Sequence, residues 1–218
     1  PAHEDHVRAI IAAAPGRIVQ ILVTHTHKDH SPGAVPLAAA TGAPVLGRRT
    51  AHAMWQDESF APTRELQGGE RLALGPGTTL EVIHTPGHAS NHLCYLLVEE
   101  DLLFTGDHVM QGSTVVINPP DGDMAAYIAS LRALAEQDLD WLAPGHGFLI
   151  EQPRAAFEKI IAHRLAREAK VVDALRDLGD DEAALLARVY ADVPERMHPM
   201  ALRSLRAHLI KLRAQGPG

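Results

Sequence analysis

Apolar residues in the first 150 positions fall into runs of strand length, separated by turns that contain glycine or proline. Residues 17–24 form an apolar run rich in β-branched side chains, which is typical of a strand buried on both faces. Residues 70–85 alternate around a glycine-containing turn at 75–77, and this alternation predicts a hairpin. Further apolar strands are expected within 43–48, 92–100, 101–107 and 141–147.

Helical spacing interrupts these runs. It predicts a first helix that ends near Gly16, a second over residues 33–41 closed by Gly42, and a third after residue 123. Asp123 is expected to cap the third helix, whose apolar stripe is made by Met124, Ile128, Leu131 and Leu134. Residues 52–66 are expected to be irregular or weakly helical.

From Pro153 the pattern changes to helices alone, over about 153–178, 181–191 and 199–214. Strands that alternate with helices predict sheets covered by helices. We therefore expect an α/β domain over residues 1–152 and a small helical domain over residues 153–218.

Composition narrows the class of protein. No apolar run is long enough to span a bilayer, and no secretory signal precedes the first helix. The single cysteine, Cys94, cannot form an internal disulfide, so we expect a cytoplasmic protein that does not enter a membrane. Residues 1–159 hold 10 Lys and Arg against 19 Asp and Glu, which argues against general polyanion binding unless bound cations reverse the local charge. Because the chain opens at Pro1, we expect residues to precede it.

The segment THTHKDH follows the first predicted strand and concentrates metal-binding side chains. His25 and His27 are two residues apart, so in an extended segment both imidazoles point the same way and can bind one ion. Asp29 and His30 lie beyond, where the chain turns and can address a second ion. Imidazole nitrogen and carboxylate oxygen bind Zn²⁺, and they also suit Fe and Mn.

Two cations need more ligands than this segment supplies. His88, Asp107 and His146 each follow an apolar strand and stand beside a glycine that permits a tight turn. We therefore predict a metal site built from the ends of several strands.

The motifs HTHKDH, PGH, GD and PGHG together resemble the metallo-β-lactamase superfamily over about residues 17–150. The resemblance implies an αββα sandwich in which His25, His27 and His88 hold one metal, Asp29, His30 and His146 hold the other, and Asp107 bridges both. It also implies that true β-lactamases lack this bridging carboxylate, which favours the glyoxalase II-like and nuclease-like branches. The family fold begins with strands before its first helix, and we expect those strands in a segment before Pro1.

The chain is most similar within this superfamily to the beta-lactamase-like protein 2 group, on the stretches DHSPGA, GDHVMQGSTVVINPPDGD and HRLAREAKVVDAL. The studied animal member of that group is an endoribonuclease with a winged-helix-like tail, and the helices after residue 181 agree in outline. Residues 196–218 contain five Lys and Arg and no acidic residue, so the last helix could contact nucleic-acid phosphates. Alternatively, this tail shapes the active-site entrance or forms a homodimer contact, and its basic residues are a solvated helix face: Arg203, Arg206, Lys211 and Arg213.

Two bound cations can share a water molecule and lower its pKa towards about 7, which provides hydroxide as the nucleophile. We therefore expect a hydrolase, with Asp29 and His108 as catalytic candidates, because Asp29 lies beside the second cation and His108 directly follows Asp107. Single-stranded RNA is one candidate substrate. The alternatives are a thioester or lactone hydrolase resembling glyoxalase II, and a nucleic-acid-binding regulator whose metal site is only structural. Of the three metals Zn is favoured, with Fe and Mn left open.

Overall fold

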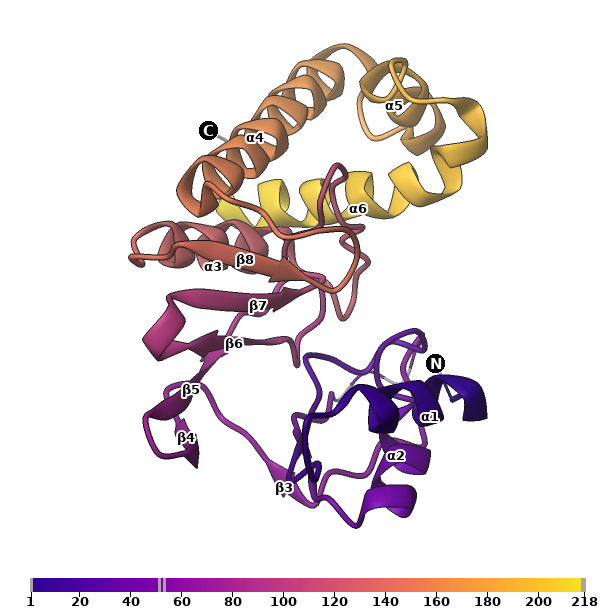
Figure 1. Ribbon diagram of the computed structural model, residues 1–218. Coiled ribbons are helices and arrows are strands. Elements are labelled where there is room, and N and C mark those ends of the chain that lie inside the picture. The colour runs from indigo at the N-terminus through magenta and orange to yellow at the C-terminus, as the bar shows by residue number, and fades with distance from the viewer. Residues whose placement is uncertain (1, 51, 53, 217–218) are drawn as a thin grey trace.

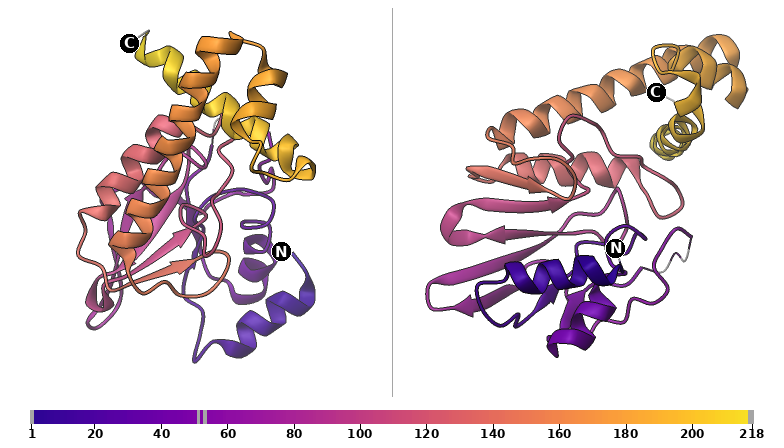
Figure 2. Two further views of the ribbon diagram at one scale, coloured as in Figure 1. Left: turned by 90° about the horizontal axis from the view of Figure 1, so that it is seen from above. Right: turned by 45° about the vertical axis from the view of Figure 1, so that its right-hand side comes forward.

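The structure is a computed structural model that describes residues 2–50, 52 and 54–216. Helices lie on the outer faces of two packed sheets, as the view from above in Figure 2 shows. Helices α1 (Glu4–Ala13) and α2 (Ala34–Thr41) cover one sheet, and α3 (Met124–Ala135) and α4 (Pro153–Leu178) cover the other. This arrangement confirms the predicted αββα sandwich.

The smaller sheet contains three parallel strands, β1 (Ile21–Leu22), β2 (Val45–Gly47) and β3 (Arg64–Glu65). The larger sheet has the order β4-β5-β6-β7-β8 and is antiparallel except for the parallel pair of β7 with β8. Its strands are β4 (Arg71–Gly75), β5 (Thr78–His84), β6 (Leu93–Leu97), β7 (Leu102–Gly106) and β8 (Trp141–Pro144), with a short 3₁₀ turn, η1 (Val98–Glu100), between β6 and β7.

Two sequence expectations about the smaller sheet are wrong in detail. The predicted strand over residues 17–24 is reduced to two residues, because the partner strand β2 has only three and the ladder can extend no further. Within the segment 52–66, expected to be irregular, Arg64 and Glu65 form β3 against β2. Ala53, which also belongs to that segment, lies outside the described residues.

Both faces of strand β6 are apolar, because each face packs into a different core. Leu93 and Tyr95 point into the core between the two sheets, whereas Cys94 and Leu96 point into the core beneath α3 and α4. The Tyr95 hydroxyl donates a hydrogen bond to the backbone oxygen of Val23 at 2.7 Å, which ties the larger sheet to the chain directly after β1. A strand whose two faces are both buried in this way is apolar at successive positions.

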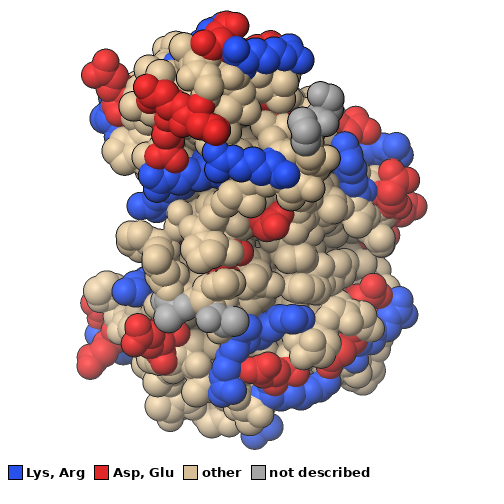
Figure 3. Space-filling model, turned by 180° about the vertical axis from the view of Figure 1, so that it is seen from behind, with Lys and Arg blue, Asp and Glu red and all other residues tan. Residues whose placement is uncertain are grey.

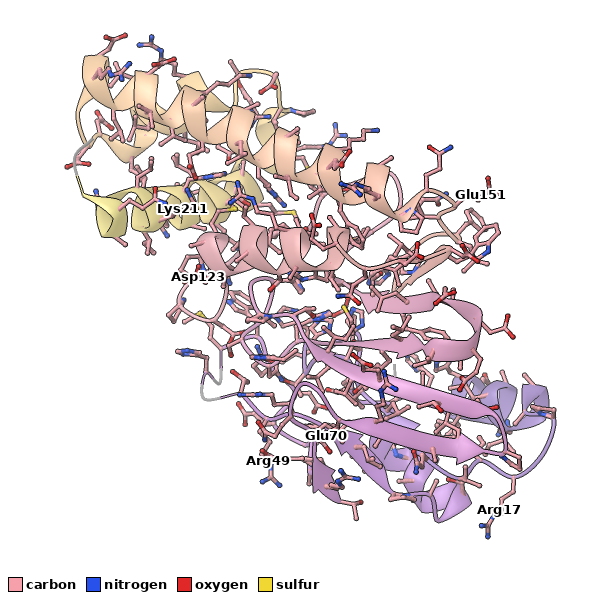
Figure 4. The ribbon with its side chains drawn as sticks, turned by 90° about the vertical axis from the view of Figure 1, so that its left-hand side faces the viewer. Arg17, Arg49, Glu70, Asp123, Glu151 and Lys211 are labelled. Atoms are coloured by element: carbon pink, nitrogen blue, oxygen red, sulfur yellow. The ribbon has the colours of Figure 1, made fainter. Side chains whose placement is uncertain are left out.

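Helix α3 begins where the sequence predicts. The Asp123 side chain, labelled in Figure 4, accepts a hydrogen bond from the backbone N–H of Ala126 at 2.8 Å and so caps the helix. The predicted apolar stripe is buried against the larger sheet, and it comprises Met124, Ile128, Leu131 and Leu134. Helix α2 likewise ends at Gly42, whose positive φ of 71° is the left-handed conformation that closes helices.

The C-terminal helices lie at one end of the molecule (Figure 1). Phe157 and Ile160, in the first half of α4, belong to the core beneath α3, whereas Val171 and Ala174 belong to a separate core with α5 (Glu182–Val189) and α6 (His198–Gln215). A 3₁₀ turn, η2 (Glu195–Met197), precedes α6. Because α4 contributes to both cores, it connects the helical end to the sandwich. The domain division at residue 152 stays a prediction.

Among the described residues, no helix combines the length and the apolar character that crossing a bilayer requires.

Replacement of Leu131 by alanine tests the core beneath α3. The Leu131 side chain is fully buried there, so we expect Leu131→Ala to lower the free energy of unfolding by about 2–5 kcal/mol. The neighbouring Arg132 is exposed, so Arg132→Ala should stay within about 0.5 kcal/mol of the parent protein. Urea unfolding followed by circular dichroism measures both, and equal losses in the two variants would contradict this core.

Candidate metal centre

All seven predicted ligands lie in loops that leave the carboxyl ends of strands. The segment from His25 to His30 follows β1, and His88, Asp107 and His146 follow β5, β7 and β8. The structure brings them into two groups, in each of which the potential ligand atoms lie within 4.8 Å of one another. One group is His25, His27 and His88, and the other is Asp29, His30, Asp107 and His146.

The spacing within each group suits a cation at its centre. The His27 Nδ1 and His88 Nε2 atoms are 3.0 Å apart, and the His146 Nε2 and Asp29 Oδ2 atoms are 3.5 Å apart. Ligand atoms about 2.0–2.1 Å from a tetrahedral ion lie about 3.3–3.5 Å from one another. Within each group, the potential ligand atoms therefore lie nearly as far apart as they would around a bound Zn²⁺ or a similar ion.

The Asp107 carboxylate faces both groups. Its Oδ1 atom lies 3.3 Å from His30 Nε2 and 3.5 Å from His146 Nε2, whereas its Oδ2 atom lies 3.8 Å from His88 Nε2. Each oxygen thus points to a different group of ligands. This is the geometry of a carboxylate that can bridge two cations.

Buried polar atoms in the site support the same conclusion. His25 Nε2, His30 Nε2 and Asp107 Oδ1 are buried and have no hydrogen-bond partner among the described residues. An unsatisfied buried polar atom costs about 1–3 kcal/mol. Coordination of divalent cations would satisfy all three atoms, so the residues present fit a pair of such ions.

The site also favours the protonation states that bind cations. Burial lowers the pKa of His25, His27 and His88, the last to about 4, and the neighbouring imidazoles lower the pKa of His25 and His88 further. For Asp107, burial opposes ionisation, but the close approach of the His30, His88 and His146 rings outweighs it and lowers the pKa of the carboxyl. Neutral imidazoles and an ionised carboxylate are the forms that coordinate metal.

Further residues orient the ligands from outside. The backbone oxygen of Val116 accepts a hydrogen bond from His88 Nδ1 at 2.9 Å, which leaves His88 Nε2 free to face the other ligands. The buried His92 ring accepts a hydrogen bond from the Asp107 backbone N–H at 3.2 Å and so helps to hold Asp107 in place. His92 therefore supports the site from outside the two ligand groups.

Gly87 lets the loop that carries His88 approach α3. Its φ is +141°, and a Cβ atom at this position would lie 2.3 Å from the Cα atom of Tyr127. The backbone oxygen of Gly87 accepts a hydrogen bond from the Asp123 N–H at 2.8 Å. The start of α3 therefore sets the position of His88.

Asp121, in the PPDGD loop, is buried and helps to hold the site together, although nothing in the sequence indicated this role. Asp121 accepts hydrogen bonds from Gln56 Nε2 and Thr50 Oγ1, both at 2.9 Å, and from Ser90 Oγ. It thus ties the segment after β2 to the loop that carries His88. The sequence showed only a turn-forming stretch here, and no local pattern distinguishes a buried aspartate from an exposed one.

His108 lies apart from the ligand groups. Its ring is fully buried, its centroid is 4.9 Å from that of Tyr127, and neither ring nitrogen has a hydrogen-bond partner among the described residues. Burial lowers the pKa of His108 to about 3, so the ring is neutral. The predicted catalytic role of His108 stays a prediction.

A cleft of about 470 Å³ opens onto both ligand groups. Besides His27, Asp29, His88, Asp107 and His146, its lining includes Lys28, Trp55, Met200 and Arg203. Met200 and Arg203 come from α6, so the C-terminal helical region forms part of the entrance. This agrees with the alternative in which the tail shapes the active-site entrance. The sequence indicated Arg203 only as part of a basic helix face, and it did not indicate Met200.

Comparison with known proteins shows the family to which the chain belongs. Residues 2–146 match the family model described as the Metallo-beta-lactamase superfamily, and residues 182–217 match the Beta-lactamase associated winged helix domain. An atrochrysone carboxyl ACP thioesterase from Aspergillus chevalieri is 31% identical over 211 residues, which cover 93% of this chain and 65% of that protein. A protein named thioesterase pkgB from Emericella nidulans is 34% identical over 154 residues, which cover 71% of this chain and 42% of that protein. The chain therefore spans about two fifths to two thirds of the length of these relatives.

Solved structures share the fold. A beta-lactamase domain protein from Burkholderia ambifaria aligns with a TM-score of 0.83 at 20% identity, covering 97% of this chain and 74% of that one. A metallo-beta-lactamase family protein from Thermus thermophilus aligns with a TM-score of 0.72 at 24% identity, covering 91% of this chain and 75% of that one. A protein solved in a di-iron-bound form aligns with a TM-score of 0.60 at 27% identity, covering 72% of this chain and 84% of that one.

The chain belongs to the metallo-beta-lactamase superfamily and carries a beta-lactamase-associated winged helix domain over residues 182–217.

Proposed function

We propose that this protein is a dinuclear metal-dependent hydrolase that cleaves thioesters. The observation that carries the proposal is the Asp107 carboxylate, whose two oxygens face two separate groups of ligands. The thioester is inferred from the relatives, because two proteins that match most of this chain are named as thioesterases. We therefore prefer the thioester hydrolase resembling glyoxalase II to an enzyme that cleaves RNA.

The residues fit two divalent cations, with His25, His27 and His88 as ligands of one, Asp29, His30 and His146 as ligands of the other, and Asp107 shared. Bound cations of this kind supply an activated water at neutral pH and polarise the carbonyl that is attacked. Nitrogen and carboxylate ligands suit Zn, Fe and Mn. The similar protein solved with two irons keeps Fe a strong candidate beside Zn.

The side chains have separate tasks in this proposal. Two hydrogen bonds position the proposed ligands. The backbone oxygen of Val116 orients the His88 ring, and His92 holds the backbone of Asp107. The Asp29 side chain is 63% exposed at the cleft, where it can accept a proton from the attacking water. The water oxygen would bond to the acyl carbon as the carbon–sulfur bond breaks, so that the acyl group is released as a carboxylate. The sulfur would leave as a thiolate and take up a proton to become the thiol, while the proton held by Asp29 returns to solvent.

No cysteine nucleophile competes with this scheme. Cys94 is the only cysteine of the chain, and it is fully buried in β6. Burial raises the pKa of its thiol to about 12, so the reactive thiolate is absent near neutral pH.

The observed charges weigh against RNA as the substrate. Arg206 and Arg213 of α6 form ion pairs with Glu182 and Asp180, and Lys211 pairs with Glu168. On the face drawn in Figure 3, basic and acidic side chains are interspersed and form no continuous basic surface. Both facts fit the solvated helix face better than a phosphate-binding helix, and the partly buried Leu202 and Leu212 beside the buried Leu205 and Leu209 supply its inner side.

A purely structural metal site is also disfavoured. Such a site closes with four ligands, whereas seven side chains converge here beside an open cleft. The predicted homodimer stays a prediction.

A substrate panel tests the proposed function. Metal-loaded protein is offered an acyl thioester of N-acetylcysteamine, a lactone, a β-lactam and labelled single-stranded RNA, and release of thiol, acid or shortened RNA is measured. We expect hydrolysis of the thioester at a rate well above that of the other three. Cleavage of RNA without cleavage of the thioester would overturn the proposal.

Asp107 should be indispensable for turnover. Loss of groups that only support a metal ligand costs about 10–100-fold in metal affinity or activity, so loss of the shared ligand itself should cost more than about 100-fold. We expect Asp107→Ala to lower thioester kcat/KM by at least that factor and to reduce the metal content below two ions per chain. Asp138→Asn, which removes an exposed carboxylate far along the chain, serves as the control and should retain full activity.

Metal removal should destabilise the folded protein. The buried atoms of His25, His30 and Asp107 have no protein partner among the described residues, so loss of the ions that would coordinate them should lower Tm by about 5–10 °C and abolish turnover when a chelator is added. Adding back Zn²⁺, Fe²⁺ or Mn²⁺ should restore both, and the ion that restores them best identifies the metal. Mg²⁺, which prefers oxygen ligands, is the control and should restore neither. An unchanged Tm after complete metal removal would contradict the assignment.

A further inference from the structure

We propose that Arg203 and Trp55 form a binding site for an anionic group on the thioester substrate. This inference rests on the proposed thioester hydrolysis, and it concerns the entrance of the cleft rather than the ligand groups. Both residues line the cleft that opens onto the metal centre, although they are 148 positions apart in the chain. Neither is a potential ligand of a cation.

The two side chains are stacked. The central guanidinium carbon of Arg203 lies 4.8 Å from the centroid of the Trp55 ring, which is the geometry of a cation–π contact. Trp55 is 52% exposed, so its indole provides an apolar wall that is open to the cleft. This contact restrains the guanidinium while its N–H groups stay available to a ligand.

Arg203 differs from the other basic residues of α6. Arg206, Lys211 and Arg213 each pair with a carboxylate, whereas Arg203 has no carboxylate within 4.0 Å among the described residues. Its positive charge is therefore not neutralised within the described part of the chain. A partly buried, unpaired guanidinium in a cleft favours an anion from outside.

The other charged residues of the cleft also favour an anionic ligand. Lys28 also lines it, is exposed, and has no ion pair with any described residue. Among the described lining residues, the carboxylates are Asp29 and Asp107, and both belong to the proposed ligand groups. Once these two are neutralised by divalent cations, the rest of the cleft is positively charged, which selects for a substrate with negative charge.

Helix α6 holds Arg203 rigidly. Ser204 and Leu205, the next residues along the helix, are buried, and the buried His208 one turn further lies 3.0 Å from Glu168 of α4 through its Nδ1 atom. Met200, three positions before Arg203, lines the same cleft and adds apolar surface. The guanidinium is thus presented by a fixed element, which lowers the entropic cost of binding.

The ligand that fits is a carboxylate or a phosphate on an otherwise apolar thioester. The planar guanidinium matches either anion through two parallel hydrogen bonds, and the indole and Met200 suit the adjoining hydrocarbon. A thioester substrate can carry such a group in two places: as a carboxylate on the acyl chain, or as the phosphate of a phosphopantetheine arm. The following comparisons separate these two sources.

Paired substrates give the kinetic test. Succinyl- and butyryl-N-acetylcysteamine differ in the acyl carboxylate, and acetyl-phosphopantetheine and acetyl-pantetheine differ in the phosphate. We expect Arg203→Met to lower kcat/KM by about 10- to 100-fold for the anionic member of one pair and by less than about twofold for its neutral partner. The pair that shows this loss identifies the source of the anion.

Arg213→Met is the matched control, because it removes the same charge from the same helix at an exposed position outside the cleft. It should leave all four substrates unchanged to within about twofold. Equal losses on charged and neutral substrates in Arg203→Met, or no loss on any, would overturn the proposal.

A binding measurement does not depend on turnover. The chain has two tryptophans, so a Trp141→Phe background leaves Trp55 as the single tryptophan, which is excited selectively at about 295 nm. We expect phosphopantetheine or succinate to change Trp55 fluorescence saturably, pantetheine to have no effect, and Arg203→Met to abolish the response. If no thioester is hydrolysed while this response is present, the proposed function fails and the anion site stands. If neither anion changes the emission, or if only an RNA oligonucleotide does, the anion site proposed here is wrong.

Discussion

The site depends on the burial of nitrogen and oxygen atoms that have no hydrogen-bond partners among the described residues. His25 Nε2, His30 Nε2 and Asp107 Oδ1 are buried within the two ligand groups, where they have little access to water. Such an arrangement is unfavourable by itself, because each atom has given up its hydrogen bonds to water. It becomes favourable when divalent cations take the place of the missing partners. The same burial that makes the cluster costly without cations lowers the pKa of His25, His27 and His88, which keeps these three imidazoles neutral and able to coordinate.

The rest of the sandwich holds these atoms at the required positions. The ligand-bearing loops leave β1, β5, β7 and β8, so two sheets must pack in a fixed relation for the two groups to meet. The hydroxyl of Tyr95 ties the sheets together, and the start of α3 fixes the loop with His88 through Gly87. Asp121 adds a third tie between the two halves. The precision of the site thus comes from the scaffold and not from the ligand residues alone.

The C-terminal helices take part in the site as well as in the fold. Because α4 contributes to two cores, α6 is placed against the cleft, where Met200 and Arg203 join Trp55. The winged helix domain therefore supplies part of the wall of the cleft. Its ion pairs leave Arg203 as the basic residue of α6 that faces the cleft without a partner among the described residues.

The sequence by itself determined the elements with strong local signals: the 70–85 hairpin, the Asp123 cap, the closure of α2 at Gly42, and the seven residues that converge. Periodicity, capping and strand-end glycines act over a few neighbouring residues, so they can be recognised along the chain. Only the tertiary structure decided the short extent of β1, the burial of His108 and Asp121, and the meeting of Trp55 with Arg203. Each of these depends on packing between segments that are distant in sequence, and no local pattern of side chains reports such contacts.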